Sequence, residues 1–145
     1  MKIRKIKEQD LRPLAELYVS VFKQEPWNED WKVDWAYERL SFIFKSHRFY
    51  GYIAEENQSI LGGVFSRIGS YRGRLELEIV EYYVCSGHQR KGVGSALLEE
   101  LKNVAETDGI SCFVLQTDKN TYAEDFYAKH GFEAHEENLL MSLTL

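Results

Sequence analysis

Residues 84–98 combine the end of an apolar strand, a basic and glycine-containing turn and the start of a helical pattern, which together are typical of an anion-binding site. Arg90 and Lys91 supply positive charge, while Gly92 and Gly94 let a ligand approach the main chain closely. The first N–H groups of a helix have no partner within the helix, and the helix dipole adds positive potential there. A phosphate would satisfy both, so we interpret this segment as a phosphate-binding turn.

Two glutamates on the strand before this turn, Glu78 and Glu81, are candidate proton acceptors. Every second residue of the segment 75–79 is apolar, and strict alternation would place Glu81 on that same apolar face. A carboxylate there requires either a buried partner or a β-bulge near Val80 that shifts the phase. Because bulges often re-aim side chains beside active sites, the irregularity favours Glu81 as a functional residue.

The segment 24–31 interrupts the helical pattern with two tryptophans, three acidic residues and a proline. One interpretation is that Trp27 and Trp31 cover the core beneath the preceding helix, since large aromatic side chains are mostly buried. The other is an aromatic and acidic wall for a cationic substrate, because a tryptophan face attracts an ammonium group. Both interpretations remain open from the sequence.

The length and composition predict a single domain over residues 1–145, with 44% hydrophobic residues available for a core. A net charge of −5 argues against a general nucleic-acid or anionic-membrane binder. There is no apolar run near the ~20 residues that span a bilayer, and no basic-then-apolar leader, so we expect a cytoplasmic protein. Cys85 and Cys112 lack the spacing of a zinc site or a disulfide framework and are expected to be unpaired thiols.

The hydrophobic pattern predicts elements that would position these residues. Three successive strands joined by short turns should be antiparallel neighbours, and a strand reached through a helix should be parallel to the one before it. We expect a first strand ending near Lys7, helices over 11–22, 33–46, 92–107 and 121–130, strands over 49–54, 59–68, 74–85 and 111–117, a turn over 69–73, and a closing strand over 138–144.

The glycine spacing excludes two common phosphate-binding patterns. The dinucleotide fingerprint needs a third glycine where Leu97 stands, and the P-loop needs Lys followed by Ser or Thr where the sequence has Val93–Gly94. The remaining pattern is Gln89-x-x-Gly92-x-Gly94 after a strand and before a helix. It resembles the central motif of the GCN5-related N-acetyltransferase (GNAT) superfamily, in which Gln or Arg is followed by x-x-Gly-x-Gly or Ala.

A second match supports the resemblance. Residues 120–132, NTYAEDFYAKHGF, are similar to the family signature Asn-x-x-Ala-x-x-Leu/Phe-Tyr-x-Lys-x-Gly-Phe. Residues 25–28, EPWN, are similar to a bacterial subgroup labelled aminoglycoside-type acetyltransferases. The resemblance implies an α/β (α+β) GNAT fold: one mixed, mostly antiparallel sheet of about six to seven strands, splayed at its centre and flanked by about four helices.

The resemblance further implies that acetyl-CoA, without a metal, binds across an opening of the sheet between strands 74–85 and 111–117. The backbone near Val84 and Cys85 would pair with the pantetheine arm, the amides of 89–95 would hold the diphosphate, and Asn120 would face the arm. The implied cofactor-binding residues are Tyr83, Val84, Cys85, Gln89, Arg90, Lys91, Gly92, Val93, Gly94, Ser95, Asn120 and Phe126.

The activity implied by the family is transfer of the acetyl group of acetyl-CoA to a primary amine of a small cationic or peptide acceptor. An alkyl ammonium must lose a proton before it attacks, so Glu81 or Glu78 would be the general base. Tyr127 stands at the family position of the general acid, although a tyrosine that only packs is the alternative. Trp27, Trp31 and Glu81 would contact the acceptor.

Two other functions remain open: a non-catalytic acetyl-CoA sensor or regulatory module, and a nucleotide-binding α/β module. Exposed strand edges at the end of the chain are compatible with a homodimer. The sequence identifies neither the acceptor, nor whether Glu81, Glu78 or water alone is the base, nor whether other acyl groups are used.

Overall fold

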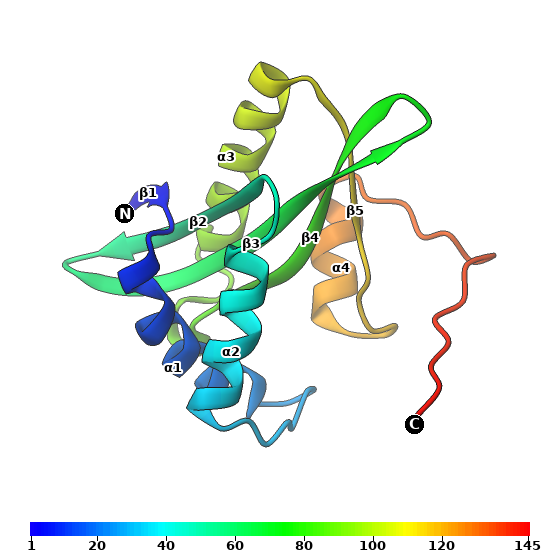
Figure 1. Cartoon of the computed structure of the whole chain (residues 1–145). Coiled ribbons are helices and arrows are strands. Elements are labelled where there is room, and N and C mark those ends of the chain that lie inside the picture. The colour runs from blue at the N-terminus through cyan, green and yellow to red at the C-terminus, as the bar shows by residue number, and fades with distance from the viewer. The chain divides into compact units, whose positions relative to one another are not determined.

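The computed structural model describes residues 1–145 and divides into two compact units, 1–115 and 116–145, which are described separately (Figure 1). No helix in it is both long enough and apolar enough to cross a membrane.

The first unit is built on a five-stranded sheet with the order β1-β2-β3-β4-β5. The first four strands pair antiparallel in succession, and β5 pairs parallel to β4, as the connections predicted. The family resemblance implied six to seven strands, so the observed count is lower. The strands are β1 (Lys2–Lys5), β2 (Phe49–Glu56), β3 (Ser59–Tyr71), β4 (Arg74–Val84) and β5 (Ile110–Leu115).

Helices cover both faces of this sheet. Helices α1 (Leu11–Phe22) and α2 (Val33–Phe44) pack on one face, and α3 (Val93–Asp108) lies behind the other (Figure 1). The core beneath α1 and α2 forms because the buried residues of both helices recur at helical spacing, so each helix presents an apolar stripe to the sheet. Its members include Leu11, Leu14, Tyr18, Val21, Ala36, Leu40, Ile43, Ile53, Phe65 and Tyr83.

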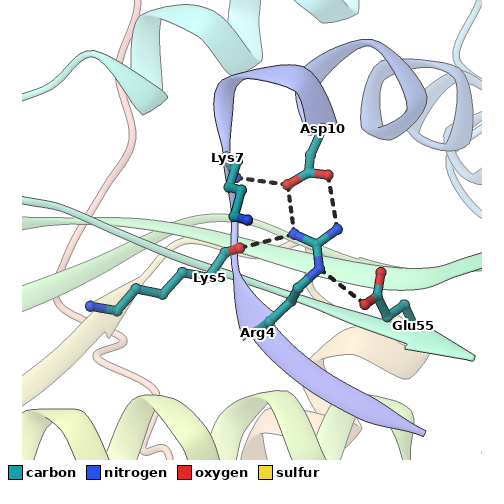
Figure 2. Close-up of polar contacts among 5 residues, drawn as sticks. All are labelled: Arg4, Lys5, Lys7, Asp10 and Glu55. Carbon is teal, nitrogen blue, oxygen red and sulfur yellow. Dashed lines mark hydrogen bonds and ion pairs between the residues drawn. The ribbon is translucent and has the colours of Figure 1, made fainter. Parts of the chain in front are cut away.

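An ion-pair cluster joins β1 to the start of α1 (Figure 2). The guanidinium of Arg4 donates to both carboxylate oxygens of Asp10, at 2.8 and 3.0 Å, and its Nε donates to Glu55 on β2 at 3.0 Å. The backbone N–H of Lys7 also donates to Asp10, at 2.7 Å. The Asp10 side chain is only 9% exposed, and the hydrogen bond from Arg4 holds the pKa of that carboxyl below its usual range. The cluster therefore fixes how the chain enters α1.

The hairpin of β3 and β4 is longer than expected. The turn predicted over 69–73 is wrong at its first half, because residues 69–71 remain paired with residues 74–76 of β4. Only Arg72 and Gly73, both with positive φ, form the turn. A two-residue turn of this kind matches the twist of the flanking strands, so pairing continues almost to the tip.

The second unit contains helix α4 (Tyr122–Lys129). Thr121 caps it, because its Oγ1 accepts the N–H of Glu124 at 3.3 Å, and Gly131 follows its end with φ of +92°. The closing strand predicted over 138–144 is absent. Leu139, Met141 and Leu143 are 80–84% exposed. The segment therefore has the alternating apolar pattern of a strand but does not form one. A strand needs a backbone partner as well as a pattern, which explains the difference.

Candidate functional site

The sheet opens between β4 and β5. Their parallel pairing ends at Ile79 and Leu115, whereas β4 continues to Val84. Just beyond β4, the N–H of Cys85 donates to Leu61 of β3 at 2.7 Å. Since successive residues of a strand direct their peptide groups to opposite sides, those of Val84 point away from β3, toward the open edge. Residues 80–84 thus form a backbone edge that β5 does not cover.

A compact turn lies at the end of this edge. The side chain of Gln89 donates to the carbonyl of Val84 at 3.1 Å, and the N–H of His88 donates to the carbonyl of Cys85 at 2.9 Å. The Cys85 thiol also lies 3.1 Å from Nδ1 of His88. The chain therefore folds back tightly on the end of β4. Gln89 makes this contact through its side chain and not through its backbone N–H.

The start of α3 has the geometry of an anion-binding turn. Arg90 and Gly92 both have positive φ, of 62° and 85°, and Gly92, the N-cap of α3, supplies no side-chain cap. The Tyr82 hydroxyl donates to the carbonyl of Gly94, which ties the first turn of the helix to β4. The positive end of a 16-residue helix and the exposed Arg90 and Lys91 therefore lie beside the open edge.

The irregularity in β4 is a β-bulge at Val80. Glu81 pairs with Phe65, and Ile79 pairs with the next residue of β3, Ser66, so Val80 has no partner. Paired residues share a face and consecutive residues do not. Ile79 and Glu81 consequently lie on opposite faces, although strict alternation would have put them together. Of the two alternatives that the sequence left open, a bulge near Val80 is therefore present.

The bulge turns Glu81 toward α1 and α2, where it is buried with two partners. The Tyr18 hydroxyl donates to Oε1 of Glu81 at 3.2 Å, and Nε of Arg39 forms a short hydrogen bond with the same atom. The Glu81 side chain is 9% exposed, against 44% for Arg39. Burial raises the pKa of Glu81, and the charge of Arg39 opposes that shift. Both outcomes expected for a carboxylate at this position, a bulge and a buried partner, occur together.

Glu78 occupies a different environment on the same face of the sheet. It pairs with Arg67, and Arg67 shares its face with Phe65, the partner of Glu81. The ion pair of Arg67 and Glu78 measures 3.3 Å, and both side chains are 46% exposed. Glu78 is therefore a solvated charge in a surface pair.

The tryptophans of the loop before α2 pack on the aromatic core. The ring of Trp31 meets Tyr18 edge-on at 5.0 Å, and Trp27 lies 5.7 Å from Phe22. Both are half-buried, which supports their role in covering the core. The three acidic residues of the loop remain exposed: Glu25, Glu29 and Asp30.

Tyr83 was expected near the cofactor, but its side chain is buried under α1, where its hydroxyl donates to the carbonyl of Leu14 at 3.0 Å. Its backbone groups, two residues before those of Cys85, also point toward β3 rather than to the open edge. Tyr18 and Arg39, by contrast, were missed. The available signals were a tyrosine within the apolar stripe of α1 and an arginine three residues after the buried Ala36 of α2.

Val93 and Ser95 lie in the first turn of α3, whereas Asn120, Phe126 and Tyr127 belong to the second unit. Asn120 has φ of 61° and donates its N–H to Glu124 at 3.0 Å. On α4 the rings of Phe126 and Tyr127 lie 5.5 Å apart, and Tyr127 contacts Phe132 at 5.4 Å. The signature segment thus forms a local aromatic cluster along the second half of α4 and the residues that follow it. Both cysteines are unpaired, and no group of His, Cys, Asp or Glu is placed to hold a metal ion.

Comparisons with known proteins agree on one family. Residues 11–132 match the model of the acetyltransferase (GNAT) family. A probable N-acetyltransferase of Drosophila melanogaster is 34% identical over 83 residues, which cover 56% of this chain and 45% of that protein, so the chain spans less than half the length of this relative. An uncharacterized N-acetyltransferase of Bacillus subtilis is 26% identical over 136 residues, covering 92% and 90%.

A solved structure is similar over nearly the whole chain. It is an aminoglycoside acetyltransferase from an uncultured soil metagenomic sample, in complex with sisomicin. The TM-score is 0.77 at 25% identity, with 99% of this chain and 95% of that one covered.

Proposed function

The chain belongs to the acetyltransferase (GNAT) family, and on that premise we propose that it moves the acetyl group of acetyl-CoA directly to a primary amine. The observation that carries the proposal is that β5 stops pairing with β4 at Ile79, so that residues 80–84 extend past β5 and lead into the positively polarised start of α3. An extended amide-containing arm pairs with such an edge as an added strand does, and a diphosphate fits a helix N-terminus.

The residues present fit acetyl-CoA. The backbone N–H of Val84, which points away from β3, would contact the pantetheine arm, and Cys85, whose N–H and carbonyl are hydrogen-bonded to Leu61 and His88, would border it. The amides of 89–95, with Arg90 and Lys91, would hold the diphosphate. When bound, acetyl-CoA supplies an acyl group activated as a thioester. Asn120 and Phe126 are carried over from the family signature and belong to the same proposal.

Glu81 is the residue we propose as general base. An alkyl ammonium has a pKa near 10 and must lose a proton before its nitrogen lone pair can attack. Burial raises the pKa of Glu81, so this carboxylate is a stronger proton acceptor than a solvated one. Glu78, exposed and paired with Arg67, is the alternative base. Tyr127 would protonate the departing thiolate.

The acceptor we propose is a small cationic amine. The exposed acids Glu25, Glu29 and Asp30 give the loop before α2 a negative field, which attracts a cation. Trp27 and Trp31 would contribute aromatic faces to the same wall, because the face of an indole ring attracts a cation. The likeness to an aminoglycoside acetyltransferase at 25% identity supports amino sugars as the first acceptors to test.

The experiment combines acetyl-CoA with sisomicin, a polyamine, a lysine-containing peptide and a peptide with an unblocked N-terminus. Thiol release and a product mass increase of about 42 units report transfer of one acetyl group in place of one proton. Acetyl-CoA binding in calorimetry without turnover on any acceptor would instead support the sensor function.

Glu81→Gln tests the base. We expect turnover to fall by about 10²-fold or more, because general base catalysis contributes that much. Acetyl-CoA affinity should stay within about twofold, since Glu81 faces α1 and α2 rather than the turn. The matched control is Glu78→Gln on the same strand face, which should retain turnover. Loss of turnover in the control alone would transfer the role to Glu78.

A further inference from the structure

The two hydrogen bonds to Glu81 converge on one of its oxygens. Tyr18 and Arg39 both donate to Oε1, and Oε2 accepts no hydrogen bond. Oε2 is nevertheless not sealed in the core, because the only buried side-chain oxygen or nitrogen without a partner is Oγ of Ser41. Glu81 therefore has one anchored oxygen and one whose lone pairs remain open.

The two donors are held by different helices. The ring of Tyr18, on α1, is packed between Phe22 at 4.4 Å, Trp31 at 5.0 Å and Tyr83 at 5.3 Å, so its hydroxyl has a fixed position. Arg39 approaches from α2 and is 44% exposed, so it lies on the solvent side of the carboxylate. Anchoring from two elements fixes the plane of the carboxylate and hence the direction of Oε2.

We propose that Tyr18 and Arg39 are positioning residues, which anchor Oε1 of Glu81 so that Oε2 accepts the proton of the acceptor amine. This inference rests on the proposed function. In the step, an N–H bond of the ammonium breaks, an Oε2–H bond forms, and the electron pair stays on nitrogen, ready to attack. No oxidation or reduction is involved, and the proton later leaves Oε2 for solvent.

The charges around Glu81 give the positioning a measurable signature. Tyr18 and Tyr83 face it from α1 and β4, Arg39 from α2, and Glu29 from the preceding loop. Arg39 and Tyr18 favour the ionised carboxylate, whereas burial and Glu29 favour the protonated form. Removing either donor should move the titration of Glu81 to higher pH, because its ionised form loses support.

The test compares Arg39→Gln and Tyr18→Phe with the wild type in a pH profile of kcat/KM. We expect the acidic limb to move up by about one pH unit in each, as loss of a neighbouring opposite charge or donor predicts. We expect kcat/KM at neutral pH to fall about tenfold or more, as for loss of a charged hydrogen bond. Arg39→Lys keeps the positive charge, so its acidic limb should lie at the wild-type pH, whereas its kcat/KM at neutral pH should stay below that of the wild type. Arg12→Gln, which removes an exposed pair with Asp34, is the matched control and should change neither.

Two further measurements separate the possible failures. Carboxyl ¹³C NMR of labelled glutamate follows the titration of Glu81 without any acceptor, so the shift is measured even if no turnover is found. A thermal melt confirms folding, and Arg39→Gln, on an exposed helix position, remains informative if Tyr18→Phe does not fold. If Glu81→Gln stays active, the proposed base is wrong. If Glu81→Gln is inactive but the Glu81 titration is unchanged in folded Arg39→Gln, the positioning role is wrong.

Discussion

Asp10 provides the sharpest test of how β1 and α1 are joined. It accepts two hydrogen bonds from Arg4 and one from the N–H of Lys7, and its side chain is only 9% exposed. Asparagine at this position keeps one acceptor oxygen but turns an NH₂ group toward the guanidinium. Hydrogen bonds to charged groups contribute about 1.5–3 kcal/mol each, and their losses are not additive. We therefore expect Asp10→Asn to lower the free energy of unfolding by about 2 kcal/mol.

Urea unfolding measures this loss. With a slope of about 1.5 kcal/mol/M, the midpoint should fall by about 1.3 M without a change in slope. The control is Asp34→Asn, whose pair with Arg12 has side chains 54% and 85% exposed. An exposed pair of this kind contributes about 0–1 kcal/mol, so the control should move the midpoint little.

The pH dependence supplies a second criterion. Arg4 lowers the pKa of Asp10 in the folded state, so the stabilisation is complete above the unfolded pKa of about 3.9 and is lost as the pH falls through the lower folded value. The difference between wild type and Asp10→Asn should be constant above about pH 5 and shrink below pH 4. A difference equal to that of Asp34→Asn, or one that does not change on acidification, would refute the reasoning.

Two paired substitutions test other parts of the fold. Ser41→Ala removes a buried hydroxyl that has no partner, so the free energy of unfolding should stay unchanged or rise by up to about 1 kcal/mol. Ser66→Ala removes a 2.6 Å hydrogen bond to the carbonyl of Tyr50 and should lower the free energy of unfolding by about 1 kcal/mol in the same urea titration. Gly92→Ala places a side chain at φ of 85° and should cost about 1–2 kcal/mol and weaken acetyl-CoA binding in calorimetry, whereas Gly69→Ala, with ordinary φ and open space, should leave affinity unchanged. Equal effects within either pair would contradict the assignment.

The pattern of residues predicted the elements of the first unit closely because each depends on local spacing. Alternation in β4 conflicted with a charge at Glu81, and that conflict indicated either a buried partner or a bulge near Val80; the structure has both. The partners of Glu81 were beyond the reach of such reasoning, since Tyr18 and Arg39 lie 63 and 42 residues away in the chain. Only the packing of α1 and α2 on the sheet brings them together.

Local patterns failed where the outcome depends on a backbone partner. The apolar alternation of 138–144 predicted a strand, yet those residues form none. The glycine at position 69 suggested a turn, but the facing residue Glu76 offers a ladder partner and the hairpin continues. Trp27 and Trp31 were open to two interpretations, because periodicity does not show whether an indole ring packs on the core or faces a ligand.

The uneven length of the strands has a consequence for local stability. At its far end β3 continues past its last pair with β2, at Arg67, so residues 68–71 are joined to the sheet only through β4 (Figure 1). Over the same stretch β4 is still paired with β5 as far as Leu75, so residues 68–71 form an edge of the sheet with one neighbour, and only the pair of Tyr71 and Arg74 lies beyond a third strand. Amide hydrogens there should exchange through brief opening of the hairpin tip, while those of β3 around Phe65, flanked by strands on both sides, should exchange only when the whole unit unfolds. The segment opposite Glu81 therefore belongs to the most slowly exchanging part of the molecule, and fraying of the tip leaves it intact.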